Sequence, residues 1–240
     1  MNLALDIGNS HTKIALFDKN ELVSIKKTSV LNVEELEILF AKHTINNAII
    51  STVKILNDDI VGYLKQKSSL ITLTEQTPIP VKNLYLSPET LGRDRLAVAV
   101  AGAAKYPKQN VLTIDIGTCI NYDFVNDKNE YLGGAISPGI DIRLKSLNAF
   151  TGKLPLVEKE PVNYFIGRST KESILSGVIN GITTELNDTI ASYKSQFPEL
   201  MVLTTGGDSS FFETRIKTTI FAVPNLVLEG LNKIIQHNAS

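Results

Sequence analysis

The residues best suited to chemistry are two copies of one short acidic motif. Asp6-Ile7-Gly8 is matched by Asp115-Ile116-Gly117, which lies 109 residues further along the chain. A carboxylate can hold a hydrated divalent cation, and a glycine lets backbone amides approach an anion closely. Each copy therefore has parts that could bind a phosphate group together with its metal ion.

The residues after the first copy add neutral donors and one cation. Asn9, Ser10 and Thr12 supply amide and hydroxyl groups, and Lys13 supplies a positive charge. The stretch from Asp6 to Lys13 has the spacing of neither a P-loop nor a dinucleotide fingerprint. An ordinary hairpin turn is the alternative, because Asp, Asn and Gly favour turns for local reasons.

A second match in the same register indicates an internal duplication. Asp18-Lys19-Asn20-Glu21 recurs as Asp127-Lys128-Asn129-Glu130, also 109 residues later. Apolar runs flank the acidic motif in both copies. We therefore expect two β-hairpins, each with an acidic bend at its tip, and two domains of related fold that cover residues 1–108 and 109–240. Two such bends facing one another would clamp a chain of phosphates and its metal.

A third motif, Gly92-Arg93-Asp94-Arg95, opens an alanine-rich segment that we expect to be helical from residue 93 to 105. A carboxylate at a helix N-terminus between two arginines can be a structural ion pair favoured by the helix dipole. It can also be a general base kept ionised by positive charge, since an ionised carboxylate can accept the proton of an alcohol that attacks phosphorus.

Two glycine-bearing stretches complete the candidate sites. Gly133 to Gly139 combines small and rigid residues, and Thr204 to Asp208 carries paired glycines after an apolar run. Both could bring bare backbone against a ligand, and both could equally be plain connecting turns.

The remaining elements follow from periodicity and capping signals. Beyond the two hairpins (2–17 and 111–125), we expect strands at 21–26, 48–50, 69–73, 130–136, 201–204 and 219–222. We expect helices at 33–43, 57–66, 93–105, 140–150, 171–194 and 225–237. Three strands followed by alternating helices and strands predict mixed sheets covered by helices.

Composition excludes several classes of function. The net charge is −1 with no long run of either sign, so we expect no nucleic-acid binding. No apolar stretch approaches the roughly 20 residues of a membrane helix, so no membrane span is expected. The start of the chain lacks the features of a secretory signal, and Cys119 is the single cysteine. These features predict a cytoplasmic protein.

Taken in order, these motifs resemble those of type III pantothenate kinases, within the acetate kinase, sugar kinase and actin superfamily. The resemblance covers the whole chain and rests on the two Asp-x-Gly bends, Gly92-x-Asp-Arg95 and Gly134-x-x-x-Pro-Gly139. It implies an α/β class: a duplicated actin-like (ribonuclease H-like) βββαβαβα fold, with two mixed sheets flanked by helices and a cleft between the halves.

The resemblance also implies a role for each motif. Asp94 would be the catalytic proton acceptor, and Asp115 would help hold a monovalent cation, K⁺ or NH4⁺. The residues implied in ATP binding are Asp6, Ile7, Gly8, Asn9, Ser10, His11, Thr12, Lys13 and Thr118. Those implied in binding the acceptor substrate are Tyr85, Gly92, Arg93, Asp94, Arg95 and Thr170.

On this resemblance the protein would transfer phosphate from ATP, with Mg²⁺, to pantothenate in the first step of coenzyme A biosynthesis. It would be a homodimer with the pantothenate pocket at the subunit interface. Arg93 stands where a small residue is frequent, which leaves its effect on the acceptor open. Two alternatives remain: a kinase of another small hydroxylated or carboxylate metabolite, and a nucleotide-binding regulator without catalysis.

Overall fold

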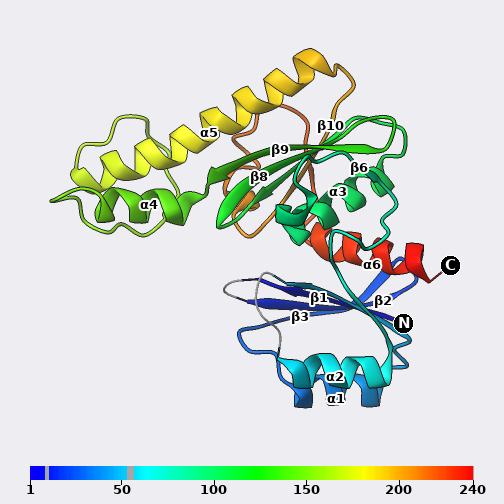
Figure 1. Ribbon diagram of the computed structural model, residues 1–240. Helices are drawn as coiled ribbons and strands as arrows, with labels where there is room; N and C mark the ends of the chain where they lie inside the picture. Colours follow the sequence, from blue (N-terminus) through cyan, green and yellow to red (C-terminus); the bar gives the residue numbers. More distant parts are fainter. Residues whose placement is uncertain (9–10, 53–56, 240) are drawn as a thin grey trace. The chain divides into compact units, whose positions relative to one another are not determined.

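The chain forms two compact units in the computed structural model, which describes residues 1–8, 11–52 and 57–239 (Figure 1). The first unit comprises Met1–Pro107, Asn129–Leu132 and Asn225–Ser240, and the second comprises Lys108–Lys128 and Gly133–Pro224. The C-terminal helix is thus grouped with the N-terminal part of the chain. The predicted domain ranges, 1–108 and 109–240, stay predictions.

The expected strands and helices are all present to within a few residues, and the structure adds a short strand, β6, that the sequence did not predict. The strands are β1 (Asn2–Ile7), β2 (Thr12–Asp18), β3 (Glu21–Thr28), β4 (Asn47–Thr52), β5 (Ser69–Thr72), β6 (Lys82–Asn83), β7 (Val111–Ile116), β8 (Cys119–Val125), β9 (Glu130–Pro138), β10 (Met201–Thr205) and β11 (Phe221–Ala222). The helices are α1 (Val33–Lys42), α2 (Asp58–Lys67), α3 (Arg93–Lys105), α4 (Ile140–Ala149), α5 (Thr170–Gln196) and α6 (Leu226–Asn238), with 3-10 turns η1 (Pro88–Thr90) and η2 (Ser209–Phe211).

Helix starts are set by the expected caps. The Asn32 side chain accepts a hydrogen bond from the backbone N–H of Glu35, and the Ser169 hydroxyl accepts one from Glu172. Such caps satisfy backbone donors that the first helical turn leaves without partners. The carboxylate of Glu35 pairs with Lys26 of β3.

The first sheet has the strand order β3-β2-β1-β4-β5, with β1 antiparallel to β2 and parallel to β4. Figure 1 shows α1 and α2 on one face of this sheet and α3 and α6 on the other. Side chains alternate along a strand, so Leu3 and Leu5 pack in the cluster with Leu36 of α1 and Leu64 of α2.

The second sheet has the order β11-β10-β7-β8-β9-β6. From β9 to β11 this sequence of neighbours reproduces the order of the first sheet, with β7 antiparallel to β8 and parallel to β10. The duplication predicted from the two acidic motifs is therefore confirmed in the topology, and the duplicated α/β fold is confirmed with it.

The two repeated Asp-Lys-Asn-Glu turns differ in conformation. In the first, only Lys19 and Asn20 separate β2 from β3, and Lys19 has a φ of 55°. In the second, β8 ends at Val125, the connection is longer, and the residue with positive φ (62°) is Asn129. Identical residues thus adopt different turns, because the length of the connection decides which position is left-handed.

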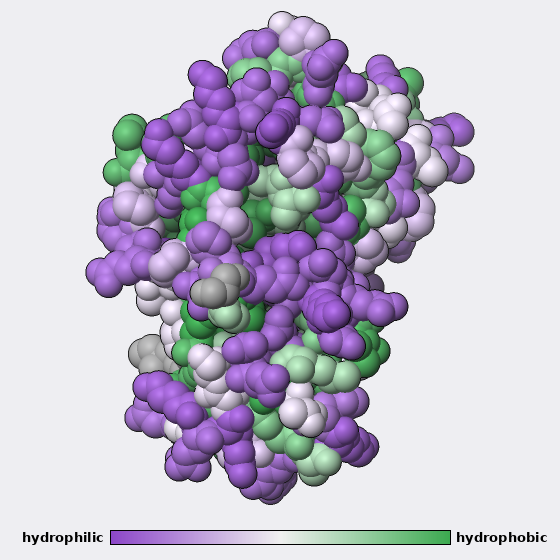
Figure 2. Space-filling model, turned by 90° about the vertical axis from the view of Figure 1, so that its right-hand side faces the viewer, coloured by the Kyte–Doolittle hydropathy of each residue, from purple (hydrophilic) through white to green (hydrophobic). Residues whose placement is uncertain are grey.

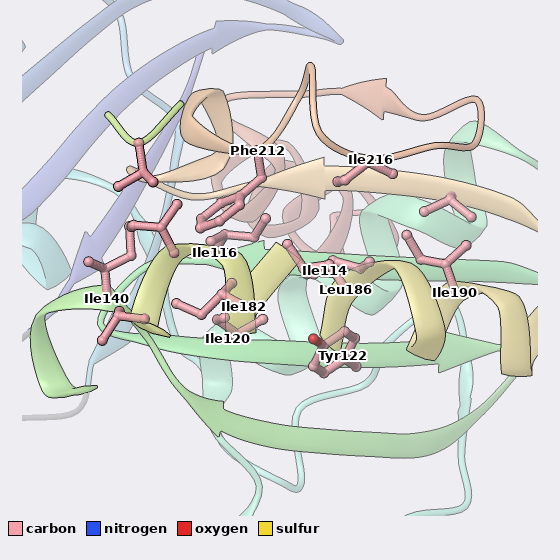
Figure 3. Packing of buried hydrophobic residues seen from close by; sticks show 14 of the residues in the cluster. Ile114, Ile116, Ile120, Tyr122, Ile140, Ile182, Leu186, Ile190, Phe212 and Ile216 are labelled. Carbon is pink, nitrogen blue, oxygen red and sulfur yellow. The ribbon is translucent and has the colours of Figure 1, made fainter. Parts of the chain in front are cut away.

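The core of the second unit lies between its sheet and the long helix α5. Figure 3 shows Ile114 and Ile116 of β7 together with Ile120 of β8, packed against Ile182 and Leu186 of α5. On the face drawn in Figure 2, hydrophilic side chains predominate and hydrophobic ones are interspersed, the usual surface of a globular protein. In the described ranges, no helix is long and apolar enough to cross a membrane.

Helices α3 and α6 approach each other closely at one glycine. A Cβ added at Gly230 would lie 1.9 Å from the carbonyl oxygen of Ala97. Because that neighbour is backbone, the two helices would have to separate to admit a methyl group.

We predict that Gly230→Ala lowers the free energy of unfolding by roughly 1–3 kcal/mol, since overpacking forces the backbone to shift. Urea denaturation measures it. Gly62→Ala in α2 is the control, because a Cβ there meets nothing within 4 Å; it should be stabilising by about 0.4–1 kcal/mol. Equal effects of the two substitutions would contradict the packing described.

Candidate active site

The first acidic bend joins β1 to β2. Asp6 lies opposite Lys13 in this antiparallel pair and beside Ser51 of the parallel strand β4. The bend is closed by a hydrogen bond from the backbone N–H of Gly8 to the carbonyl of His11, 3.1 Å long. A carboxylate and an ammonium group are thus held on neighbouring strands at the end of a hairpin. Asn9 and Ser10, both predicted to bind ATP, lie outside the described residues.

The carboxyl of Asp6 is in an unusual electrostatic environment. Burial raises its pKa to about 6; the positive charge of Lys13 opposes the rise and the negative charge of Asp94 adds to it. The fold therefore brings Asp94 into the electrostatic neighbourhood of Asp6 although the two are far apart in sequence. A desolvated carboxylate of this kind gains from a nearby cation.

The other predicted residues of the first bend divide by exposure. Ile7 and Thr12 are buried, and Ile7 belongs to the hydrophobic core, so any contact of theirs with a ligand would come from backbone groups. The side chain of His11 is exposed. Lys13 is half-buried beside Asp6 and is the cation of the bend best placed to meet a phosphate.

The N-terminus of α3 presents Asp94. Its Oδ1 accepts a hydrogen bond from the backbone N–H of Arg95 (2.9 Å), which holds the carboxylate at the positive end of the helix. A Cβ at Gly92, the cap residue, would lie 2.6 Å from the same oxygen. The glycine of this motif therefore leaves room for the carboxylate to fold back on the helix end.

The two arginines that flank Asp94 have different environments. Arg93 pairs with Glu75 (2.6 Å) and donates to the carbonyls of Pro88 and Leu91. Its charge is thus compensated by Glu75, and its fork ties down the loop before α3. Arg95 is 5% exposed, and its guanidinium lies 5.6 Å from the ring centre of Tyr85.

Tyr85 belongs with Arg95 in the first unit. Its ring also stacks on Tyr131, with centroids 6.1 Å apart. The predicted acceptor-binding residues Tyr85, Gly92, Asp94 and Arg95 are therefore grouped around the start of α3. An aromatic ring, a cation and a carboxylate thus lie together at the start of this helix.

The second acidic bend joins β7 to β8. Asp115 lies opposite Asn121 of β8 and beside Thr205 of β10. The paired-glycine turn packs directly on it: a Cβ at Gly206, whose φ is 98°, would lie 2.5 Å from Asp115 Oδ1 and 2.3 Å from the carbonyl oxygen of Ile116. The acidic bend at Asp115 and the paired-glycine turn at Gly206, which are far apart in the sequence, are thus in direct contact.

Thr118 at the tip of this bend is exposed, as a ligand contact requires. Its carbonyl accepts a 3.0 Å hydrogen bond from the N–H of Gly139. A Cβ at Gly139 would lie 2.1 Å from the carbonyl oxygen of Gly117, and one at Gly134 would lie 1.8 Å from that of Tyr122. The small residues of this stretch are therefore needed for contact between backbone segments of the protein itself.

Thr170, the remaining predicted acceptor-binding residue, is the first residue of α5, in the second unit. It lines a pocket of about 950 Å³ between α4 and α5. Polar and apolar side chains share the lining, which includes Arg143, Leu147, Leu154, Arg168, Ser173 and Ile174. A small polar metabolite would fit this mixture.

Sequence reasoning missed two groups of charged residues in the second unit. Lys159, from the irregular segment before α5, binds Asp208 at 2.7 Å and Asp141 at 3.5 Å. The bonds to Asp208 raise the pKa of Lys159, although its burial opposes them. The second group joins Tyr122, Arg143 and Glu185. Neither has a local sequence signal, because the members come from separate elements.

The donor set limits which metal could bind. Within the described part of the chain, no three or more His, Cys, Asp or Glu side chains cluster as a metal site. Asp6 and Asp115 each offer carboxylate oxygens, the ligands that hard cations such as Mg²⁺ prefer. The half-buried, partly desolvated carboxylate of Asp6 fits a cation held jointly with a phosphate ligand.

A family model and two similar relatives of this chain agree on one family. A family model described as type III pantothenate kinase matches residues 2–192. Proteins named type III pantothenate kinase from Christiangramia forsetii and Bacteroides fragilis are 47% and 44% identical to this chain. The alignments cover 99% of this chain in both cases, and 99% and 98% of the two relatives.

Solved structures support the fold alone. A conserved putative Baf family transcriptional activator from Campylobacter jejuni aligns with a TM-score of 0.61 at 22% identity, over 99% of this chain and 98% of that one. A putative N-acetylmannosamine kinase from Listeria monocytogenes aligns with a TM-score of 0.56 at 14% identity, over 100% and 99% of the two chains.

The coupling among Asp6, Lys13 and Asp94 is directly testable. We predict that Asp94→Asn lowers the pKa of Asp6 below about 6, because a repelling negative charge is removed, and that Lys13→Met raises it. Titration of the Asp6 carboxyl carbon by NMR measures both shifts. Asp59→Asn, at the equivalent position of α2, is the control and should leave the titration unchanged. A rise of the Asp6 pKa in Asp94→Asn, a fall in Lys13→Met, or no shift in either variant would refute the arrangement.

Proposed function

We infer that this protein phosphorylates pantothenate with ATP, because the chain belongs to the type III pantothenate kinase family. Full-length similarity to proteins of that name carries this conclusion. The product, 4′-phosphopantothenate, enters coenzyme A biosynthesis.

We assign the proton transfer to Asp94. The acceptor hydroxyl attacks the γ-phosphorus as the bond to ADP breaks, and the hydroxyl proton passes to the carboxylate. Oδ1 of Asp94 is held by the N–H of Arg95, so Oδ2 is the oxygen assigned to take the proton. Most of the rate enhancement in this class of reaction comes from positioning and charge neutralisation.

We assign the phosphates of ATP to the first bend, from Asp6 to Lys13. Thr118, in the second unit, is assigned to ATP as a separate residue. Asp6 would hold Mg²⁺, directly or through water, and Asp115 would help hold K⁺ or NH4⁺. The ions would supply positive charge to the transferring phosphoryl group. The raised pKa of Asp6 supports its assignment, since a bound cation would offset the cost of a buried carboxylate.

We assign acceptor binding to Tyr85, Gly92 and Arg95 in the first unit and, as a separate assignment, to Thr170 in the second unit. The neutralisation of Arg93 by Glu75 argues against a direct role for Arg93, and the planar fork of Arg95 suits a carboxylate such as that of pantothenate.

We further propose a homodimer that uses α5. Gly177 and Gly181 lie one helical turn apart, and a Cβ at either would meet nothing within 4 Å. Phe165, which lines one hollow with both glycines, is 82% exposed, and the next residue in the chain, Ile166, is 79% exposed. Small residues allow close helix packing and exposed apolar side chains mark interaction surfaces, so this face of α5 suits a second copy of the chain.

Asp94→Asn is expected to lower turnover by at least about a hundredfold, since a positioned general base contributes roughly 10²–10⁴-fold. ATP affinity should change little, because the substitution is nearly isosteric. A coupled assay of ADP release with pantothenate measures turnover, and calorimetry with ATP measures binding.

Asp59→Asn is the matched control for that experiment, and it should retain wild-type turnover. Near-normal turnover of Asp94→Asn would refute the base. Running the wild type in potassium and in sodium buffer tests the monovalent site, where equal rates would count against it. A panel of other hydroxylated acceptors, and ATP consumption without any acceptor, test the alternative kinase and the regulator.

Gly181→Leu should convert the proposed dimer to monomer, because the larger side chain would hold two α5 helices apart. Sedimentation velocity measures the mass in solution. Gly62→Leu is the control, since Gly62 is also helical with open space around it, and it should leave the mass unchanged. A dimer that survives Gly181→Leu would place the interface elsewhere.

A further inference from the structure

A polar network in the second unit connects β8, α4 and α5. None of its three members was predicted from the sequence to belong to a site. The hydroxyl of Tyr122 in β8 donates to Oε1 of Glu185 in α5 (2.9 Å). The other carboxylate oxygen of Glu185 pairs with Arg143 of α4. Glu185 is therefore fixed from two sides, and it fixes Arg143 in turn.

Arg143 uses its remaining donors on one short segment. Its Nε donates to the carbonyl of Pro138 (2.8 Å), and its Nη2 donates to the hydroxyl of Ser137 (3.0 Å). Its backbone N–H donates to the carbonyl of Gly139 (3.1 Å). The three bonds hold residues 137–139 against the start of α4.

The segment held by Arg143 lies directly on the second acidic bend. The N–H of Gly139 donates to the carbonyl of Thr118, and the backbone at Gly139 is too close to Gly117 to admit a Cβ. The position of Thr118 therefore depends on where Gly139 is held. A chain of contacts runs from Glu185 through Arg143 and Gly139 to Thr118.

The electrostatics favour a charged pair in this network. Burial would raise the pKa of Glu185, but hydrogen bonds from Arg143, Ser137 and Tyr122 and the charge of Arg143 outweigh it, and the pKa is lowered overall. Glu185 is therefore ionised at neutral pH, and its bond to the guanidinium is charge-assisted.

We propose that Arg143, held by Glu185, is a positioning residue that keeps Thr118 in place for ATP. The inference rests on the proposed function, in which Thr118 contacts ATP. Arg143 acts through the backbone of Gly139 and does not touch the reacting atoms.

A direct role for Arg143 at the acceptor is the competing account, because Arg143 also lines the pocket that contains Thr170. The two accounts predict different kinetics. Loss of a positioning residue for Thr118 raises the KM for ATP, whereas loss of an acceptor contact raises the KM for pantothenate.

The test uses Arg143→Lys and Glu185→Gln in the full-length protein. Lysine keeps the charge but cannot make the planar fork that bonds Pro138, Ser137 and Glu185 together. A displacement of 1 Å can cost about a hundredfold, so for a smaller shift we expect the KM for ATP to rise about tenfold in Arg143→Lys and somewhat less in Glu185→Gln. The KM for pantothenate should stay within about twofold.

Arg215→Lys is the matched control. Arg215 also ties a carbonyl in the second unit, that of Val162, but has no bond to residues 137–139. It should lower the melting temperature without changing the KM for ATP. Unchanged ATP kinetics in both test variants, or a rise confined to the KM for pantothenate, would overturn the proposal.

Calorimetric titration with ATP measures nucleotide binding without any acceptor, so it tests the positioning role whatever the acceptor is. If pantothenate is not the substrate, the wild type shows no turnover with it, yet weakened ATP binding in the two variants still supports the positioning role. If Arg143→Lys does not fold, Ser137→Ala and Glu185→Gln, which remove less, give the same reading.

Discussion

The partial desolvation of the Asp6 carboxylate, opposite Lys13 and within the field of Asp94, is the interaction that defines the first acidic bend. Taking a carboxylate out of water is unfavourable unless charges or donors compensate it. Here compensation within the unit is partial, since Lys13 attracts and Asp94 repels, and the pKa stays raised. The hydrophobic core formed with α1 and α2 stabilises the strands that impose this arrangement. A carboxylate whose pKa is raised in this way is a candidate for a functional site.

Close backbone contacts give the second unit a comparable constraint. Gly139 and Gly206 both contact the bend between β7 and β8, and neither position has space for a side chain. Such contacts leave the bend little freedom, and a rigid bend presents its hydroxyl and carboxylate without an entropic cost at binding. The network from Glu185 to Gly139 extends this rigidity into α4 and α5.

The two sheets share their strand order, but the residue opposite the acidic carboxylate differs between them. Lys13 faces Asp6 in the first hairpin, whereas the neutral Asn121 faces Asp115 in the second. The cross-strand residue thus gives the two acidic bends different local charge on the same duplicated scaffold.

The sequence by itself determined the strands and helices except the short β6, and also the duplication and the residues of each motif, because periodicity, turn residues and repeats are local signals. Asp6, Asp94, Asp115 and Thr118 could be named from it. Only the tertiary structure decided that Asp94 affects Asp6, that Glu75 neutralises Arg93, and that the glycines at 139 and 206 serve the bend. It also revealed Arg143 and Glu185. These properties depend on contacts between residues far apart in the chain, and no local pattern of side chains encodes such contacts.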